Sequence, residues 1–136
     1  MKLHHNPETT LNFDGSIESI EHILPQNPDQ GYSAKEKSWA KNPNIVHALG
    51  NLLLITKNAN SSLSNKPFDE KKKKKEYLKG SYSEKEVAKN ASFGVEQIKE
   101  RSERLLDFLI AHYRIAELVG ESAIKAFKNA LLKDIK

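Results

Sequence analysis

A carboxylate and an imidazole stand side by side at Glu21 and His22, within the apolar segment 20–26, IEHILPQ. An imidazole can take up a proton near neutral pH because its ordinary pKa is about 6.5, and a carboxylate can bind a metal ion. On a strand, neighbouring side chains point to opposite faces, so the two could share a site only where the strand ends or bulges. Taken alone, this short segment favours a half-buried histidine beside a surface glutamate over a catalytic pair.

Two asparagines follow at points where the chain changes its local structure. Asn51 comes after Gly50 at the start of the apolar run 52–56, and Asn60 lies in a stretch rich in Asn and Ser. Asparagine is common at such positions because its side chain bonds to nearby backbone groups. An amide oxygen also suits a hard cation such as Mg²⁺, so Asn60 is either a loop residue or a metal ligand.

Lysines occupy every position from 71 to 75, shortly after Lys66. A solvated helix face is the ordinary interpretation of such a run, and a phosphate-binding patch is the alternative. Five consecutive residues cannot face one way on a helix, so only two or three of them could contact one ligand. The net charge of +4 is a weak indication of a polyanionic partner such as nucleic acid.

The elements that must position these side chains are short strands followed by helices. Segment 52–56 is apolar and follows a turn signal, which predicts a strand, and segment 16–24 predicts another short strand, though from a mixed pattern. Ser33 and Glu36 have the spacing of a helix capping box. Helices are expected at 33–41, 69–78, 84–89 (capped by Ser83), 95–119 and 122–135. The fold class predicted is therefore α+β with helix dominant.

Composition excludes several kinds of protein. The chain of 136 residues has the size of one domain, and it contains no cysteine, which rules out disulfides and thiolate chemistry. No apolar run approaches the roughly 20 residues that span a bilayer. The first residues do not form a signal peptide, so a cytoplasmic location is the expectation.

In their order and spacing, these segments together resemble the His-Asn-His (HNH) nuclease superfamily. More narrowly, they resemble the C-terminal nuclease domain of GmrSD-type, modification-dependent (type IV) restriction enzymes. The segments that carry the resemblance are 20–26 (IEHILPQ), 47–54 (HALGNLLL), 60–68 (NSSLSNKPF), Lys71-Lys72 with Tyr77, and 98–101 (IKER). The resemblance extends from about Ser16 to about Tyr113. It implies a ββα-metal core, in which two antiparallel strands and a helix surround one divalent metal ion.

The resemblance also implies a role for each candidate residue. His22 matches the general base, and Glu21 matches the acidic position beside it, which commonly binds metal. Asn51 matches the middle asparagine, which holds the strand–loop geometry and orients the base. Asn60 matches the third position, a metal ligand, where an amide oxygen favours Mg²⁺ or Mn²⁺ over zinc. His47 is a possible secondary residue of the same site.

The implied activity is metal-dependent hydrolysis of DNA phosphodiester bonds in a restriction or phage-defence system. Lys66, Lys71, Lys72 and Lys73 are expected to hold backbone phosphates, and so DNA is the expected partner. The alternative is a catalytically silent domain that binds nucleic acid or docks on a partner of such a system.

Full-length members of this family carry an N-terminal nucleotide-hydrolysing domain, and the sequence contains no Gly-rich phosphate loop that would supply it. We therefore expect either a fragment or a reduced nuclease, with such a domain or subunit as a possible partner. The expected organisation is a lead-in at 1–15, a nuclease domain at 16–119, and a C-terminal amphipathic helix at 120–136.

Overall fold

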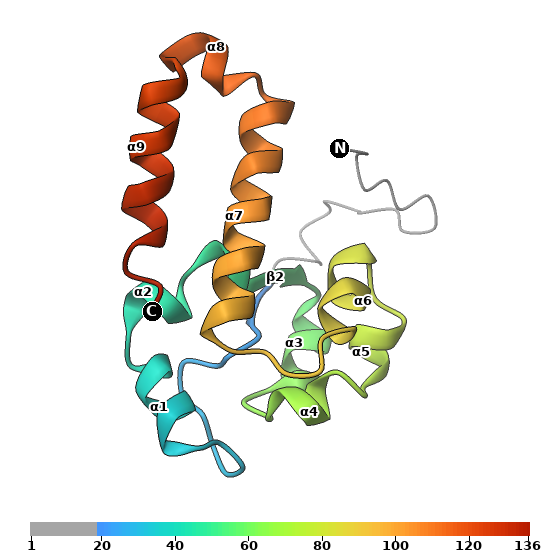
Figure 1. The fold of residues 1–136 in the computed structure, drawn as a ribbon. Coiled ribbons are helices and arrows are strands. Elements are labelled where there is room, and N and C mark those ends of the chain that lie inside the picture. Colours follow the sequence, from blue (N-terminus) through green and yellow to red (C-terminus); the bar gives the residue numbers. More distant parts are fainter. Residues whose placement is uncertain (1–18) are drawn as a thin grey trace.

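The computed structural model describes residues 19–136, so the lead-in expected at 1–15 lies outside the described residues. Within 19–136 the protein has one two-stranded sheet and nine α-helices, which confirms the helix-dominant α+β class (Figure 1). None of the helices in this part of the chain is long and apolar enough to cross a membrane.

The sheet pairs β1 (Ser19–His22) with β2 (Leu52–Ile55) in antiparallel register, with His22 opposite Leu52. Both strands were predicted, and β2 shows the expected alternation: Leu53 is buried and Leu54 is exposed, because successive side chains point to opposite faces. Helix α3 (Lys57–Leu63) begins directly after β2, where the Thr56 side chain accepts a hydrogen bond from the backbone of Ala59. The result is a continuous strand–strand–helix arrangement.

The remaining helices surround this arrangement. They are α1 (Ala34–Ala40), α2 (Pro43–Val46), the 3-10 helix η1 (Leu49–Asn51), α4 (Phe68–Lys71), α5 (Lys75–Leu78), α6 (Tyr82–Ala88), α7 (Val95–His112), α8 (Ile115–Val119) and α9 (Glu121–Leu132). The predicted capping box of α1 is present: Ser33 Oγ accepts from the Glu36 backbone, and the Glu36 carboxylate accepts from the Ser33 backbone.

Three predicted helices differ in extent. The one expected at 69–78 is split into α4 and α5, which are separated by Lys72–Lys74. Helix α6 begins after Ser81 and not after Ser83. The one expected at 95–119 ends at His112, because Arg114 adopts a left-handed conformation with φ 52° that turns the chain into α8.

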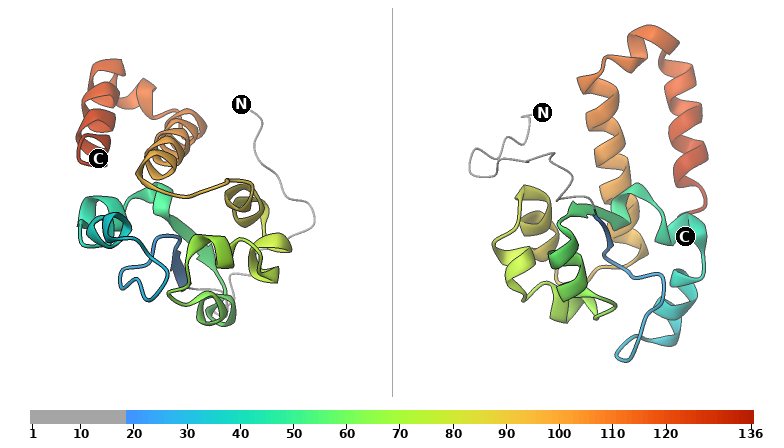
Figure 2. Two further views of the ribbon diagram at one scale, coloured as in Figure 1. Left: turned by 60° about the horizontal axis from the view of Figure 1, so that its bottom comes forward. Right: turned by 180° about the vertical axis from the view of Figure 1, so that it is seen from behind.

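Helices α7 and α9 run side by side as a hairpin that projects from the rest of the fold, with α8 at its tip (Figures 1 and 2). At its base, α7 packs directly on the backbone of η1. A Cβ atom at Gly50 would lie 1.9 Å from the carbonyl oxygen of Ile98, so this approach is possible only with glycine. The buried apolar core joins β2 and the residues just after β1, Ile23 and Leu24, to α7, and Leu132 and Ile135 at the end of the chain complete it.

Candidate active site

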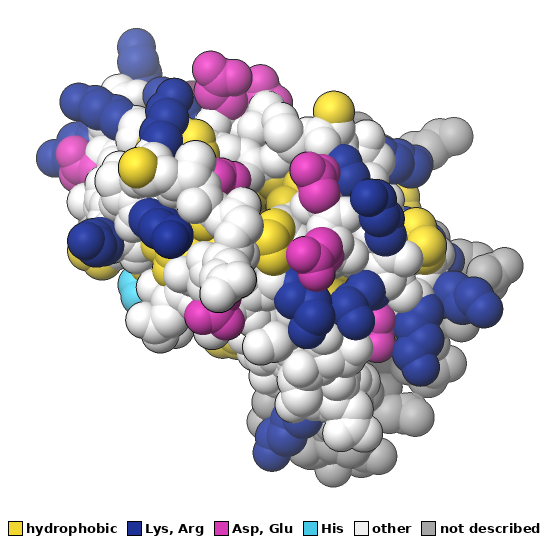
Figure 3. Space-filling view, turned by 90° about the horizontal axis from the view of Figure 1, so that it is seen from below, with side chains coloured by type: hydrophobic (Ala, Val, Ile, Leu, Met, Phe, Trp, Pro, Cys, Tyr) yellow, Lys and Arg dark blue, Asp and Glu magenta, His cyan; other side chains and the backbone are white. Residues whose placement is uncertain are grey.

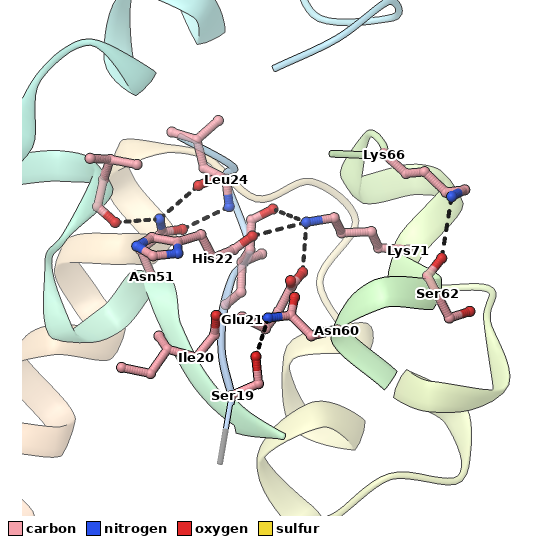
Figure 4. Close-up of polar contacts among 12 residues, drawn as sticks. Ser19, Ile20, Glu21, His22, Leu24, Asn51, Asn60, Ser62, Lys66 and Lys71 are labelled. Atoms are coloured by element: carbon pink, nitrogen blue, oxygen red, sulfur yellow. Dashed lines mark hydrogen bonds and ion pairs between the residues drawn. The ribbon is translucent and has the colours of Figure 1, made fainter. Parts of the chain in front are cut away.

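Asn51 holds the chain where β1 ends. Its side chain is fully buried, its Oδ1 accepts from the backbone N–H of Leu24 at 2.8 Å, and its Nδ2 donates to the carbonyl oxygens of Leu24 (2.9 Å) and Val46 (2.8 Å). The Asn51 carbonyl also accepts from the Ile23 backbone. Asn51 therefore ties the segment after β1 to the segment before β2 (Figure 4). This agrees with the expected structural role, in which the middle asparagine holds the backbone beside the histidine.

Glu21 and Lys71 form a buried ion pair beneath β1. Lys71 Nζ lies 2.6 Å from Glu21 Oε1 and also donates to the carbonyl oxygens of His22 (2.9 Å) and Ile23 (3.3 Å) (Figure 4). Burial raises the pKa of Glu21 and lowers that of Lys71, whereas their mutual contact opposes both changes. Lys71 thus fixes the carboxylate of Glu21 and the backbone of His22 together.

This placement corrects the expectation that Lys71 contacts DNA. Its side chain has no exposed surface, and its ammonium is already bonded to three oxygens, so a phosphate cannot reach it. The other lysines named as DNA contacts lie at or near the surface. Lys72 is partly covered and bonds to the Ala91 carbonyl, Lys66 bonds to the Ser62 carbonyl, and Lys73 is exposed.

Basic side chains on the underside of the molecule are interspersed with acidic ones and do not gather into one patch (Figure 3). Lys72 illustrates this, because its ammonium lies 2.9 Å from the carboxylate of Asp69. The lysine run therefore divides between one buried residue and neighbours with different surroundings, because the chain leaves α4 after Lys71 and enters α5 only at Lys75.

His22, at the end of β1, is half-buried and meets a second histidine. Its Nε2 lies 3.2 Å from Nδ1 of His47, and the two rings meet edge to face. Burial lowers the pKa of His22, and the nearby His47 and Lys71 lower it further. A lowered pKa favours the neutral ring, which is the state in which an imidazole can accept a proton.

Asn60 reaches from α3 to β1. Its Nδ2 donates to Ser19 Oγ at 2.5 Å and to the Ile20 carbonyl at 3.1 Å, and Oδ1 takes part in neither bond. These bonds fix the amide of Asn60 against the strand that carries Glu21 and His22 (Figure 4). An oxygen held in this way is suited to bind a cation without reordering the side chain.

The structure brings three of the predicted residues to one place. Glu21, His22 and Asn60 line a polar hollow of about 190 Å³, together with Gln26, Asn65 and four other residues. Asn51 does not line this hollow, and His47 contacts two of its lining residues, His22 and Gln26. The hollow thus combines an imidazole, a carboxylate and an amide oxygen.

Arg101 and Ser102 of α7 support the site from behind, and the sequence offered no role for them. Arg101 donates to the carbonyl oxygens of Gly50 (2.9 Å) and Leu52 (3.0 Å), and Ser102 Oγ accepts from the Gly50 backbone at 2.8 Å. Together they hold the turn that contains Asn51. The signal available in the sequence was an arginine and a serine on the face of α7 that also carries Ile98, which is buried.

The donor set of the hollow fits a hard divalent cation better than zinc. Glu21 and Asn60 supply oxygen atoms, and Mg²⁺ commonly takes one or two protein oxygens and completes its shell with water and phosphate. Within residues 19–136 no group of three or more His, Asp or Glu side chains is arranged to hold a metal ion. The nearby ammonium of Lys71 also disfavours a cation, so we expect weak binding.

Comparison with known proteins identifies one family. The model for "GmrSD restriction endonucleases, C-terminal domain" matches residues 1–108. No curated protein and no solved structure gave a significant match. The matched region contains both strands, α3, α4 and most of α7, and therefore every residue that lines the hollow.

Proposed function

The chain belongs to the family of GmrSD restriction endonuclease C-terminal domains, and we propose that it is a metal-dependent nuclease of the HNH type with His22 as its general base. A restriction endonuclease acts on DNA, so the substrate bond is a phosphodiester. The observation that carries the proposal is the hollow itself: an imidazole lies beside a carboxylate and a fixed amide oxygen, between the end of β1 and α3.

In the proposed reaction, His22 takes a proton from a water molecule as its oxygen attacks phosphorus. The new bond joins this oxygen to phosphorus, the bond from phosphorus to the 3′-oxygen breaks, and the leaving 3′-oxygen takes a proton from water. No covalent intermediate with the protein forms. Asn51 contributes by tying the backbone just after His22 to the end of α2, since its three side-chain bonds reach Leu24 and Val46. Positioning of this kind supplies much of the catalysis in phosphoryl chemistry.

Glu21 and Asn60 are the residues that would hold Mg²⁺ or Mn²⁺. When bound, such an ion stabilises negative charge on the phosphate and on the leaving oxygen. Lys71 keeps one oxygen of Glu21 occupied, since it bonds to Oε1, and so Oε2 is the atom left for a metal ion. In this scheme Lys71 is a positioning residue for Glu21 and the end of β1.

Contacts to the DNA backbone are assigned to Lys66, Lys72 and Lys73. Lys66 and Lys72 already bond to carbonyl oxygens, which orders their side chains near α4. Lysine contacts of this kind weaken with salt, because binding releases counterions from DNA. We propose residues 16–119 as the nuclease unit, a cytoplasmic location, and a nucleotide-hydrolysing domain or subunit as its partner.

The first test is nicking of a supercoiled plasmid with Mg²⁺ or Mn²⁺ against EDTA, comparing the wild type with His22→Ala. A general base contributes about 10²- to 10⁴-fold, so His22→Ala should lose at least a hundredfold in rate. His112→Ala, on the hairpin, is the matched control and should cut normally. Unchanged activity in His22→Ala would exclude the mechanism. DNA binding without cutting by the wild type would favour the catalytically silent alternative.

The second test concerns Asn60. Asn60→Ala should weaken binding of Mn²⁺, measured by electron paramagnetic resonance of the free ion, and should lower cleavage at limiting metal. Its melting temperature should stay near that of the wild type, because its bonds lie at a partly exposed edge of the sheet. Asn58→Ala on the exposed side of α3 is the control. Normal Mn²⁺ affinity in Asn60→Ala would remove Asn60 from the metal site.

A further inference from the structure

The ring of His47 is placed by the end of α2, outside the hollow that His22 lines. Its backbone N–H bonds to the Pro43 carbonyl at 3.0 Å, which fixes the point from which the ring extends. From there Nδ1 meets Nε2 of His22 at 3.2 Å, with the ring planes at 75° to each other. The two nitrogens therefore share one proton in a hydrogen bond.

The direction of this hydrogen bond decides what His22 can do. A neutral imidazole carries one proton and one lone pair on its two nitrogens. If Nε2 of His22 donates to His47, the lone pair remains on Nδ1 of His22, where it can receive a proton from water. If His47 donates instead, Nδ1 of His22 carries the proton, and the neutral ring has no unused lone pair.

Gln26 stands at the other end of the same chain of contacts. Its side-chain amide nitrogen lies 3.4 Å from Nε2 of His47, and Gln26 also lines the hollow beside His22. In this orientation the amide nitrogen can only donate to Nε2 of His47, which makes Nδ1 of His47 the donor to His22. A half-turn of this amide presents its oxygen to His47 in place of its nitrogen and reverses these roles. That oxygen can accept the Nε2–H of His47, which leaves Nδ1 of His47 as an acceptor for His22.

We propose that His47 is a positioning residue that selects the tautomer of His22, by accepting the Nε2–H of His22 at its own Nδ1. Gln26 supports this arrangement by turning its amide oxygen toward Nε2 of His47. The lone pair on Nδ1 of His22 then takes the proton of the attacking water. This inference rests on the proposed function, because it matters for catalysis only if His22 is the base.

The kinetic test uses His47→Leu, which removes the acceptor, and His47→Asn, whose side-chain oxygen can replace Nδ1. Rates are measured as steady-state plasmid cleavage over a range of DNA concentrations. His47→Leu should lower kcat about 10- to 100-fold, part of what a general base contributes, with little change in KM. His47→Asn should recover most of this loss, and His112→Leu should change neither parameter. A wild-type kcat in His47→Leu overturns the inference.

A second readout does not require turnover. The ¹⁵N chemical shifts of the His22 ring, identified by their loss in His22→Ala, report which nitrogen carries the proton above about pH 8, where ordinary histidines are neutral. We expect the Nε2–H form in the wild type and in His47→Asn, and a mixture of both forms in His47→Leu. An Nδ1–H form in the wild type would overturn the inference.

The two readouts separate this inference from the proposed function. If His22→Ala still cuts DNA, the proposed function fails, whatever the ring shifts show. If His22→Ala is inactive but His47→Leu is fully active, the inference alone fails. Melting curves of the His47 variants show whether either substitution unfolds the protein, and the ring shifts remain informative in any variant that folds.

Discussion

The region around the sheet and the projecting hairpin hold their polar side chains in opposite ways. Near β1 and β2, the side chains of Glu21, Asn51 and Lys71 are almost completely buried, and each is bonded to atoms of other segments. In the hairpin, the ion pairs lie at the surface: Lys128 meets Asp107 at 2.5 Å, and Arg114 meets Glu117 at 2.8 Å.

Apolar side chains show a weaker contrast. The sheet region buries Ile23 and Leu53 on one side and exposes Ile20 and Leu54 on the other, whereas the hairpin exposes Leu118 at 81%, Tyr113 at 64% and Phe127 at 51%. The family match ends at residue 108, inside α7, so the three exposed hairpin residues all lie beyond it. Buried polar groups cost free energy unless every one is bonded, and this molecule concentrates them where the candidate site must be rigid.

The comparison can be tested most strongly at Lys71. Lys71→Met should lower the free energy of unfolding by about 3–5 kcal/mol, because Glu21 would be left as an unpaired buried carboxylate. The measurement is urea denaturation followed by circular dichroism. Lys73→Met, in the same lysine run but exposed, is the matched control and should change stability by less than about 0.5 kcal/mol. Equal losses in the two variants would show that Lys71 is not held as described.

The double variant Glu21→Met with Lys71→Met sharpens the same point. Replacing both members of a buried ion pair by apolar residues removes the unpaired charge, so the double variant should be more stable than Lys71→Met alone. It should nevertheless lose metal binding, since Glu21 is one of the two proposed oxygen donors. The double variant would then show that the contribution of this ion pair to folding stability can be separated from the contribution of Glu21 to metal binding.

Asn51→Ala should produce the next largest effect. It leaves the N–H of Leu24 and two carbonyl oxygens without their partner, and each unsatisfied buried group costs about 1–3 kcal/mol. Partial relaxation of the loop should bring the total to about 3 kcal/mol, measured by urea denaturation. Asn58→Ala, exposed on α3, should be nearly neutral. If Asn51→Ala lowered the free energy of unfolding by less than about 1 kcal/mol, Asn51 would not be the residue that holds the backbone of the site in place.

What the sequence predicted well depends on local patterns. The apolar run 52–56 after a turn signal predicted β2, and the spacing of Ser33 and Glu36 predicted the start of α1, because both signals are local. The segments around Glu21, His22 and Asn60 indicated that these residues belong together, and the structure brings all three to one hollow. Their catalytic and metal-binding roles stay predictions.

What the sequence did not predict depends on contacts between distant segments. Lys71 is 50 positions from Glu21, and nothing within a run of five identical residues distinguishes the buried one from its neighbours. A hint was available in Phe68, because residues three apart share a helix face and Phe68 is buried. Arg101 was missed for the same reason, since it bonds to backbone about fifty positions earlier.

The smallest expected effect lies in the hairpin, at Lys128. Its ammonium pairs with Asp107 and, at 3.5 Å, with Glu103, and these bonds raise the pKa of Lys128. Both carboxylates are about half exposed, so water and salt compete for the same charges. Lys128→Ala should therefore lower stability by less than about 1 kcal/mol and leave plasmid cleavage unchanged. A loss as large as that of Lys71→Met would mean that the hairpin, too, depends on its ion pairs, and the contrast between the two regions would fail.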